Sequence, residues 1–301
     1  MNESERPLAT IALLTYNQER YIREAVEGAL AQDYSPLEII LSDDCSTDRT
    51  FNIIRELSES YKGPAALNVR RNERNLGLSG HINEVMKTAS GELIVVAAGD
   101  DISLPTRVSE NVKFYIASGK PDSIFSDYID IDESGDEVVP RPESAPFEQS
   151  IEEFIDSPAI KGAAHAWSRR VFEQFGPLSS DVLCEDQVIP FRAYLLKRPR
   201  LLNLRLVKYR RVDRVTDRTT YFRRHYRRQL TSRAQYLKDL RARSSVGKDL
   251  EARIERQLEL CRVQDRFWTS GWIAALSVWP ALTSKIGCRA SLLELGRKAI
   301  G

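Results

Sequence analysis

The chain has 301 residues, with 44 Lys and Arg against 43 Asp and Glu and a formal net charge of +1. This length allows one large domain or two modest ones, each with a hydrophobic core. The polar N-terminal residues lack the apolar segment of a secretory signal, and the four cysteines lack paired metal-site spacing. We therefore expect a cytoplasmic protein with reduced thiols, and not a secreted or disulfide-linked one.

Over the first 120 residues, apolar runs of strand length alternate with segments whose apolar residues recur at helical spacing. The runs predict strands over residues 8–14, 37–42, 66–70 and 93–98. Helices are predicted over residues 22–30, 46–57 (with Ser46 as N-cap), 80–89 and Pro105 to Ile116. This order predicts right-handed crossovers and a doubly wound, mainly parallel α/β sheet flanked by helices.

Beyond residue 120 the pattern is looser. Strands are predicted over residues 123–131, 163–167 and 201–209, a turn at 133–136 and a proline-rich loop at 139–149. From about residue 220 the chain reads as entirely helical. We therefore predict a first domain over residues 1–216 and a C-terminal helical extension over residues 217–301.

The two parts differ strongly in charge. Residues 1–196 hold 18 Lys and Arg against 34 Asp and Glu, whereas residues 197–301 hold 26 against 9. Such a division predicts different partners for the two halves, and a basic face favours phosphates, nucleic acid or an acidic membrane. The alternative is that the halves neutralise each other across a shared interface.

Three acidic pairs carry most of the functional argument: Asp43-Asp44, Asp100-Asp101 and Glu185-Asp186. The first two each follow an apolar run that reads as a strand. In sheets of this kind, ligands bind beyond the carboxyl ends of the strands. Carboxylates at that place can hold a metal, a ribose or a reacting hydroxyl.

These pairs belong to a longer series of motifs. The series consists of Thr15-Tyr16-Asn17, Asp43 to Asp48, Asn75-Leu76-Gly77, Gly99-Asp100-Asp101 and Glu185-Asp186. In order and spacing, over roughly residues 7–216, it resembles glycosyltransferase family 2. The resemblance implies a GT-A (Rossmann-like) fold and an inverting, metal-dependent transfer of a sugar from a nucleotide diphosphate. A glycan or lipid-linked acceptor in bacterial surface polysaccharide synthesis, of the O-antigen or capsule type, would fit such an enzyme.

The resemblance assigns Asp101 as a metal ligand and Asp100 as a ribose or metal contact. Magnesium or manganese suits an all-oxygen site, whereas zinc would call for His or Cys ligands that the motif lacks. A cation there would stabilise the charge that develops on the pyrophosphate leaving group. The alternative for this acidic pair is a cap ahead of the helix that begins near Pro105.

The same resemblance assigns a nucleotide-binding role to Thr15, Tyr16, Asn17 and Asp44. Tyr16 would stack on the base and Asp44 would accept a hydrogen bond from it, which suits UDP, dTDP or GDP donors. Asp43 is either a turn cap or a functional group. Arg71 and His81 could reach the pyrophosphate, although a lone helical histidine is more often an ordinary surface or core residue.

Asp186 is expected to be the base that removes the proton of the acceptor hydroxyl. Glu185 would orient that base or bind the acceptor. Paired acids at a helix start also have a purely capping explanation.

Two departures from the family pattern concern the metal. Ala98 stands where relatives often carry a further acid, and Val212 replaces a histidine that often binds the metal. Asp213 could substitute for that histidine, or the metal could be held more weakly. The Gln-x-x-Arg-Trp motif of processive synthases is absent from the sequence, which favours single-sugar transfer.

The C-terminal region suggests a surface contact. Residues 197–233 hold fourteen Lys and Arg against two acids, and Trp268, Trp272 and Trp279 lie close together. The apolar stretch around them is shorter than the ~20 residues of a spanning helix. One hypothesis is docking on the anionic inner face of the cytoplasmic membrane. The other is a helical subdomain that packs on the catalytic core or in a homo-oligomer.

Other function classes fit less well. A sugar nucleotidyltransferase would carry a Gly-rich, Arg-containing loop after the first strand, where this chain has Thr15-Tyr16-Asn17-Gln18. A nucleic-acid-binding protein lacks a supporting motif here, and unneutralised acids at strand ends would repel phosphate, so no nucleic-acid partner is expected. A non-catalytic scaffold of the same fold remains open because of Val212.

Overall fold

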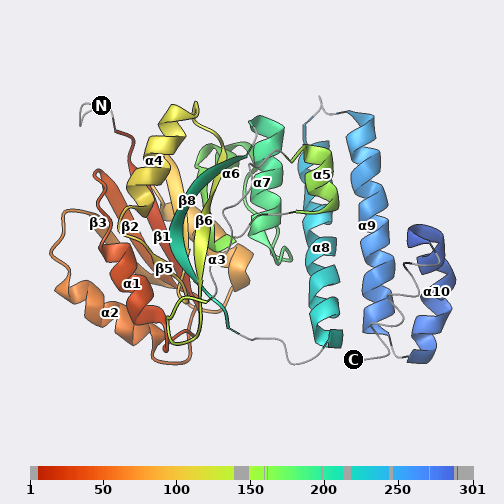
Figure 1. Cartoon of the computed structure of the whole chain (residues 1–301), viewed down its shortest axis with the longest axis horizontal. Coiled ribbons are helices and arrows are strands. Elements are labelled where there is room, and N and C mark those ends of the chain that lie inside the picture. The colour runs from red at the N-terminus through yellow and green to blue at the C-terminus, as the bar shows by residue number, and fades with distance from the viewer. Residues whose placement is uncertain are drawn as a thin grey trace. The chain divides into compact units, whose positions relative to one another are not determined.

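The computed structural model describes residues 6–138, 149–158, 160, 162–197, 199–212, 218–243, 247–270, 272–287 and 290. The chain forms two compact units. The sheet unit comprises Met1–Gln149, Ala159–Ser180 and Glu185–Val212, and the helical unit comprises Ser150–Pro158, Asp181–Cys184 and Asp213–Gly301. The helical unit thus takes in two short segments from the middle of the chain, as well as the C-terminal helices (Figure 1).

The sheet unit is built on eight strands in the order β3-β2-β1-β4-β7-β6-β8-β5. The strands are β1 (Ala9–Thr15), β2 (Leu37–Asp43), β3 (Ala66–Arg71), β4 (Leu93–Ala98), β5 (Ile102–Ser103), β6 (Ser123–Ile131), β7 (His165–Ser168) and β8 (Arg200–Arg210). All the predicted strands are present within a few residues of their expected bounds, and β5 is a short addition. At the predicted strand over 163–167, residues Gly162–Ala164 instead form the 3-10 turn η2.

Strand direction places one end of most strands at a common edge. Strands β1, β2, β3 and β4 pair with one another in parallel. Strand β7 is antiparallel to both β4 and β6, and β8 is parallel to β6. The carboxyl ends of β1, β2, β3, β4, β6 and β8 therefore lie at one edge of the sheet, which we call the carboxyl edge. Both acidic pairs that follow strands lie at this edge.

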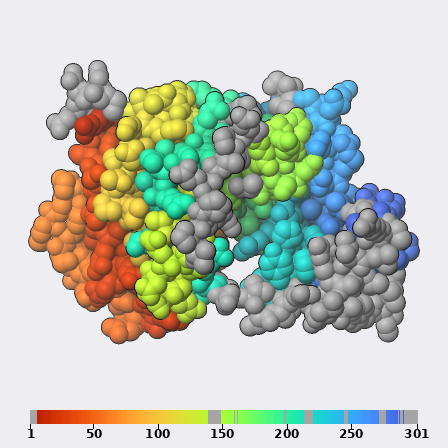
Figure 2. Space-filling model, viewed as in Figure 1, coloured from red at the N-terminus to blue at the C-terminus, as the bar shows by residue number. Residues whose placement is uncertain are grey.

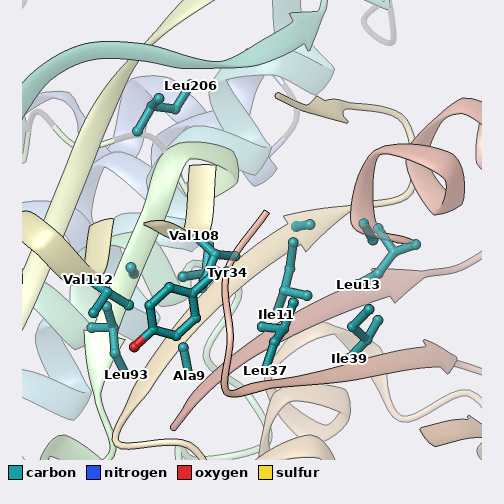
Figure 3. Close-up of a cluster of buried hydrophobic side chains, with 14 of the residues drawn as sticks. Ala9, Ile11, Leu13, Tyr34, Leu37, Ile39, Leu93, Val108, Val112 and Leu206 are labelled. Atoms are coloured by element: carbon teal, nitrogen blue, oxygen red, sulfur yellow. The ribbon is translucent and has the colours of Figure 1, made fainter. Parts of the chain in front are cut away.

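Helices cover both faces of the sheet. They are α1 (Ile22–Leu30), α2 (Thr50–Ser60), α3 (Gly77–Thr88), α4 (Arg107–Ala117), α6 (Arg170–Phe175) and α7 (Glu185–Leu196). Odd-numbered residues of β1, namely Ala9, Ile11 and Leu13, join one buried cluster with side chains of α1, α2 and α4 (Figure 3). Even-numbered positions of β2 face the other side, where the Ser42 hydroxyl contacts His81 of α3.

Burial accounts for the stability of this arrangement. Ile11, Leu13, Ile39 and Val95 are fully buried. Each apolar side chain of this size contributes about 1.5–3 kcal/mol when it leaves water. The continuous apolar character of β1, β2 and β4 thus follows from burial on both faces.

The start of α2 differs from the prediction. The helix begins at Thr50, and its N-cap residue Arg49 makes no side-chain cap. The hydroxyl of Ser46, predicted as the cap, instead accepts from the Asn17 backbone N–H at 2.9 Å and donates to the Asp43 carboxylate. The capping prediction was therefore wrong, because this hydroxyl bonds to Asp43 of its own turn and to Asn17 of the β1–α1 loop.

The helical unit contains α5 (Ile151–Asp156), α8 (Arg218–Arg241), α9 (Lys248–Thr269) and α10 (Trp272–Ile286). Its core gathers aromatic side chains: Phe222 stacks on Trp268 with ring centroids 4.5 Å apart, and Phe267 and Leu282 are fully buried beside them. The Arg233 guanidinium donates to the Ile155 carbonyl at 2.7 Å, and Arg253 pairs with Asp156. Figure 2 shows the yellow-green α5 against the blue α9.

Among the described residues, no helix has the length and apolar content that crossing a membrane requires.

Candidate active site

The loops after β1, β2 and β4 continue the pairing of the sheet beyond the strand ends. The Asp44 N–H donates to the Thr15 carbonyl at 2.9 Å, and the Gly99 N–H donates to the Leu14 carbonyl at 3.1 Å. On the other side, the Asn72 N–H donates to the Asp43 carbonyl at 2.8 Å. The predicted site segments therefore lie side by side along the carboxyl edge.

Asp43 is fully buried and surrounded by donors. Its carboxylate accepts from the Ser46 N–H at 2.9 Å and from the Thr15 hydroxyl at 3.3 Å, and it pairs with the Arg71 Nε at 3.2 Å. These contacts close the turn after β2 and tie it to β1 and β3. Of the two roles considered for Asp43, the turn cap is the one that its contacts display.

Asp44 is 2% exposed, and one carboxylate oxygen already has two partners. Its Oδ1 accepts from the Asn72 side-chain amide at 2.6 Å and from the Leu76 N–H at 2.9 Å. Asp44 thus organises the loop between β3 and α3. Its contact with a nucleobase stays a prediction.

Residues Tyr16 and Asn17 divide two tasks. Asn17 adopts a left-handed backbone (φ 52°), and its side-chain oxygen accepts from the Thr47 N–H at 2.8 Å, which fixes the β1–α1 loop to the β2–α2 loop. Tyr16 is 45% exposed. This exposure leaves the side chain accessible, and its stacking on a base stays a prediction. Thr15 is buried.

Arg71 and His81 lie at different depths. The side chain of Arg71 is 42% exposed and its Nη2 donates to the Ser46 carbonyl at 2.6 Å, so part of the guanidinium faces solvent. His81 is 3% exposed, its Nε2 lies 2.6 Å from the Ser42 hydroxyl, and burial lowers its pKa to about 4. These contacts favour a structural role for His81, and the predicted pyrophosphate contact is untested.

Asp100 and Asp101 follow β4 at a point of close approach. A side chain on Gly99 would clash, because its Cβ would lie 2.4 Å from the Gln18 Oε1 and 2.8 Å from the Thr15 Cγ2. Asp101 is 4% exposed and accepts from the Arg210 N–H at 2.8 Å. Burial, reinforced by the neighbouring Asp100 charge, raises the pKa of Asp101 to about 7. Burial thus outweighs the favourable charges of Arg107 and Arg210, and the charged form of Asp101 is disfavoured unless a further positive charge is bound.

A buried arginine connects Asp101 to the segment before β7. Arg107, at the start of α4, is 1% exposed and lies close enough to Asp101 for mutual electrostatic effects on their pKa values. Its Nη2 donates to the Val96 carbonyl at 2.6 Å and to the Ala163 carbonyl at 2.8 Å. Arg107 therefore fixes η2 against the end of β4.

The third acidic pair lies directly beside η2. A Cβ built on Gly162 would lie 2.4 Å from the Glu185 Oε1 and 3.4 Å from the Asp186 Cβ. A larger residue at this position would force the Glu185 carboxylate to move. Through Arg107 and Gly162, the structure brings Glu185-Asp186 to the end of the sheet that carries Asp100-Asp101.

The residues present fit a divalent cation of the magnesium type. Within the described part of the chain, no three His, Cys, Asp or Glu side chains are grouped to hold a metal. Magnesium commonly uses only one or two carboxylates and takes its other oxygens from substrate phosphates and water. Asp100 and Asp101 supply two adjacent carboxylates. Asp213, the doubtful third ligand, lies outside the described residues.

Comparisons with known proteins agree with this arrangement. The family described as Glycosyl transferase family 2 matches residues 10–176, which is more than half of the chain, so the chain belongs to this family. The predicted membership and the predicted glycosyltransferase class are both confirmed. The fold is that of GT-A glycosyltransferases, as predicted.

Individual relatives cover different parts of the chain. A UDP-Glc:alpha-D-GlcNAc-diphosphoundecaprenol beta-1,3-glucosyltransferase, WfaP of Escherichia coli, is 34% identical over 36% of this chain and 41% of its own. The UDP complex of S. aureus TarS 1-349 superposes with a TM-score of 0.63 at 16% identity, over 92% of this chain and 80% of that one. The mannosyltransferase PcManGT from Pyrobaculum calidifontis, solved with GDP-Man and Mn2+, gives 0.61 at 16% identity, over 99% and 81%.

The alignments with the curated relatives span between 16% and 46% of those proteins.

Sequence reasoning missed three residues that build the site: Arg107, Gly162 and Arg210. Arg107 adjoins the apolar positions of α4, and helical spacing alone gives no sign that an arginine is buried. Arg210 follows the predicted strand over residues 201–209, and nothing in that pattern indicates that its side chain is buried. For Arg107 and Arg210, a charged residue immediately beside apolar positions was an available signal.

Proposed function

We propose that this protein transfers a single sugar, with inversion, from a nucleotide diphosphate donor to a glycan or lipid-linked acceptor. Asp186 acts as the base, Glu185 supports it, and Asp100 and Asp101 hold magnesium or manganese. One observation carries the proposal: two acidic pairs distant in sequence lie toward the same edge of the sheet, linked indirectly through Arg107 and Gly162. One pair suits a cation on the leaving group, and the other suits a proton acceptor.

The chemistry follows from these positions. A divalent cation bound there supplies charge stabilisation to the departing diphosphate. The Asp186 carboxylate accepts the proton of the acceptor hydroxyl as that oxygen attacks the anomeric carbon. Tyr16, with its exposed ring, stacks on the base of the donor, and Arg71 faces the phosphates.

The donor is less defined than the reaction. Relatives and neighbours are named with UDP-glucose, UDP-GlcNAc and GDP-mannose, so both uracil and guanine are candidates. WfaP is named for an acceptor on diphosphoundecaprenol, which supports a lipid-linked acceptor and a role in surface polysaccharide synthesis.

Thermal unfolding with UDP, dTDP, GDP and CDP, each with and without manganese, tests the proposal. A ligand at a hundredfold excess over its dissociation constant adds about 2.7 kcal/mol of stability. We expect one diphosphate to raise the midpoint only when manganese is present. If none of the four raises it, the site is not a donor site of this kind and the scaffold alternative gains support.

The base is tested by Asp186→Asn. This variant should keep the metal-dependent midpoint shift and lose transfer by about 10²–10⁴-fold. Glu185→Gln is the matched control for the adjacent acid and should lose less. Turnover retained by Asp186→Asn would remove Asp186 as the base.

We also propose that α8 brings the enzyme to the anionic inner face of the cytoplasmic membrane. Arg224, Arg227 and Arg228 are exposed at spacings of three and four residues, and none has an ion pair with a described residue. Tyr221, 50% exposed, precedes them on the same face. Each arginine near an anionic surface contributes about 1 kcal/mol.

Flotation with vesicles tests this contact. Wild type should float with phosphatidylglycerol vesicles and not with phosphatidylcholine vesicles, and added salt should release it. Reversal of the three arginines to glutamate should abolish flotation. The same reversal at Arg256, Arg262 and Arg266, exposed on α9, is the control and should leave it largely intact. Equal loss in both variants would reject a specific α8 face.

A further inference from the structure

Arg210 contacts both members of the acidic pair after β4. It is the last residue of β8, and its side chain is 1% exposed. Its backbone N–H donates to the Asp101 Oδ1 at 2.8 Å, and its Nε donates to the Asp100 carbonyl at 3.0 Å. One residue therefore fixes the carboxylate of one acid and the backbone of the other.

The rest of the guanidinium is anchored to three further segments. Its Nη1 donates to the carbonyls of Asp132 and Glu133, both at 3.0 Å, in the turn after β6. Its Nη2 pairs with the Glu24 carboxylate of α1, and its central carbon lies 4.7 Å from the centre of the Tyr21 ring. A planar fork with donors in fixed directions can make these contacts at once, whereas a lysine ammonium cannot.

Charge in this cluster is arranged to suit a cation beside it. A buried guanidinium close to two metal-binding acids would compete with the metal for their negative charge. The Glu24 carboxylate, half exposed, offsets that guanidinium charge. Arg210 can therefore hold the acidic pair in place through hydrogen bonds without replacing the cation.

We infer that Arg210 is a positioning residue that sets the metal affinity of the Asp100-Asp101 pair, with Glu24 as its charge partner. The inference rests on the proposed metal-dependent function. Groups that orient metal ligands commonly change metal affinity by 10–100-fold when they are altered. The geometry here differs from a capping arrangement, because the bonds reach the acids from a strand 109 residues further along the chain.

The experiment uses the nucleoside diphosphate that stabilises the wild-type protein, at a saturating concentration. It measures the manganese concentration that gives half of the maximal shift in the thermal unfolding midpoint. Arg210→Lys keeps the charge and loses the fork, and it should raise this concentration about tenfold. Arg205→Lys, on the same strand and paired with Asp127 at 3.7 Å, is the matched control and should leave it unchanged. The steady-state constant for manganese should move in parallel, while kcat at saturating manganese changes less.

Further outcomes are decisive. An unchanged manganese requirement in Arg210→Lys, with a normal wild-type response, overturns the inference and leaves the proposed function intact. A wild type that does not respond to manganese rejects the proposed metal site and the inference with it. If Arg210→Lys does not fold, Glu24→Gln takes its place, because that carboxylate is half exposed and its loss leaves the guanidinium charge unopposed. It should raise the manganese requirement about threefold, and an unchanged requirement would again overturn the inference.

Discussion

The acidic pairs that follow β2 and β4 lie at the same edge of the sheet, yet their surroundings differ. The carboxylates of Asp43 and Asp44 accept hydrogen bonds from nearby loop residues, and Asp43 also forms an ion pair with Arg71. Asp101 accepts one backbone N–H and lies near Arg107 and Arg210, yet burial and its acidic neighbour raise its pKa to about 7. The first pair therefore builds the loops that surround the site, whereas a bound cation would favour the charged form of Asp101 in the second pair.

Substitution of Asp101 should have the largest effect on activity. Asp101→Asn keeps an oxygen for the Arg210 N–H and removes the charge that would hold the metal. We expect metal-dependent donor binding to be lost and transfer to fall by at least about 100-fold, as measured by manganese-dependent midpoint shifts and by turnover. The variant should unfold near the wild-type midpoint, because the removed charge was buried beside another acid. Normal donor binding with metal would show that our assignment of the metal site is wrong.

Substitution of Asp43 should have the opposite pattern. Asp43→Asn weakens the pair with Arg71 and the bonds from Ser46 and Thr15, so the free energy of unfolding should fall by about 2–3 kcal/mol. Denaturant titration measures this loss. The surviving folded protein should keep its metal response with little change. A stable Asp43→Asn variant without donor binding would assign Asp43 to the ligand and not to the turn.

The coupling between the second pair and α7 is tested at Gly162. A methyl group there would push the Glu185 carboxylate away, at a cost of about 1–3 kcal/mol of stability. Turnover in Gly162→Ala should fall about tenfold while the diphosphate still binds with metal, because we propose that Glu185 serves the acceptor and not the donor. Gly247→Ala is the control, since its Cβ would meet nothing within 4 Å. Equal turnover in the two variants would separate Glu185 from the reaction.

The succession of strands and helices along the chain and the positions of the acids could be predicted because they depend on local patterns. A buried strand reads as an apolar run, and an acid directly after it must lie at the carboxyl edge. Arg210 and Gly162 could not be predicted, because their roles depend on contacts between strands and loops distant in sequence. Ser46 shows the same limit. Its residue type favours a helix cap, but in the fold its hydroxyl bonds to Asp43 and to the Asn17 N–H instead. The inclusion of Ser150–Pro158 in the helical unit also follows from tertiary packing alone.

The smallest effect concerns two buried histidines, His81 beside the first pair and His165 of β7. Burial lowers the pKa of His81 to about 4 and of His165 to about 3, from an ordinary value of 6.5. Below that ordinary value the unfolded chain binds protons that the folded chain does not. These histidines therefore contribute stability that is complete above pH 6.5 and is lost as the pH falls toward their folded values.

Each histidine should cost about 1.4 kcal/mol per pH unit in that window. Between pH 7 and pH 5, His81→Gln should lose less stability than wild type, by up to about 2 kcal/mol at the lower pH. The chain has three histidines, so imidazole resonances can be assigned by single substitutions. The His81 and His165 rings should keep neutral chemical shifts throughout this range. A His81 ring that titrates near pH 6.5 would mean that solvent reaches Ser42 and the Asp44 loop, and the interior beneath the first acidic pair would then be open to a ligand.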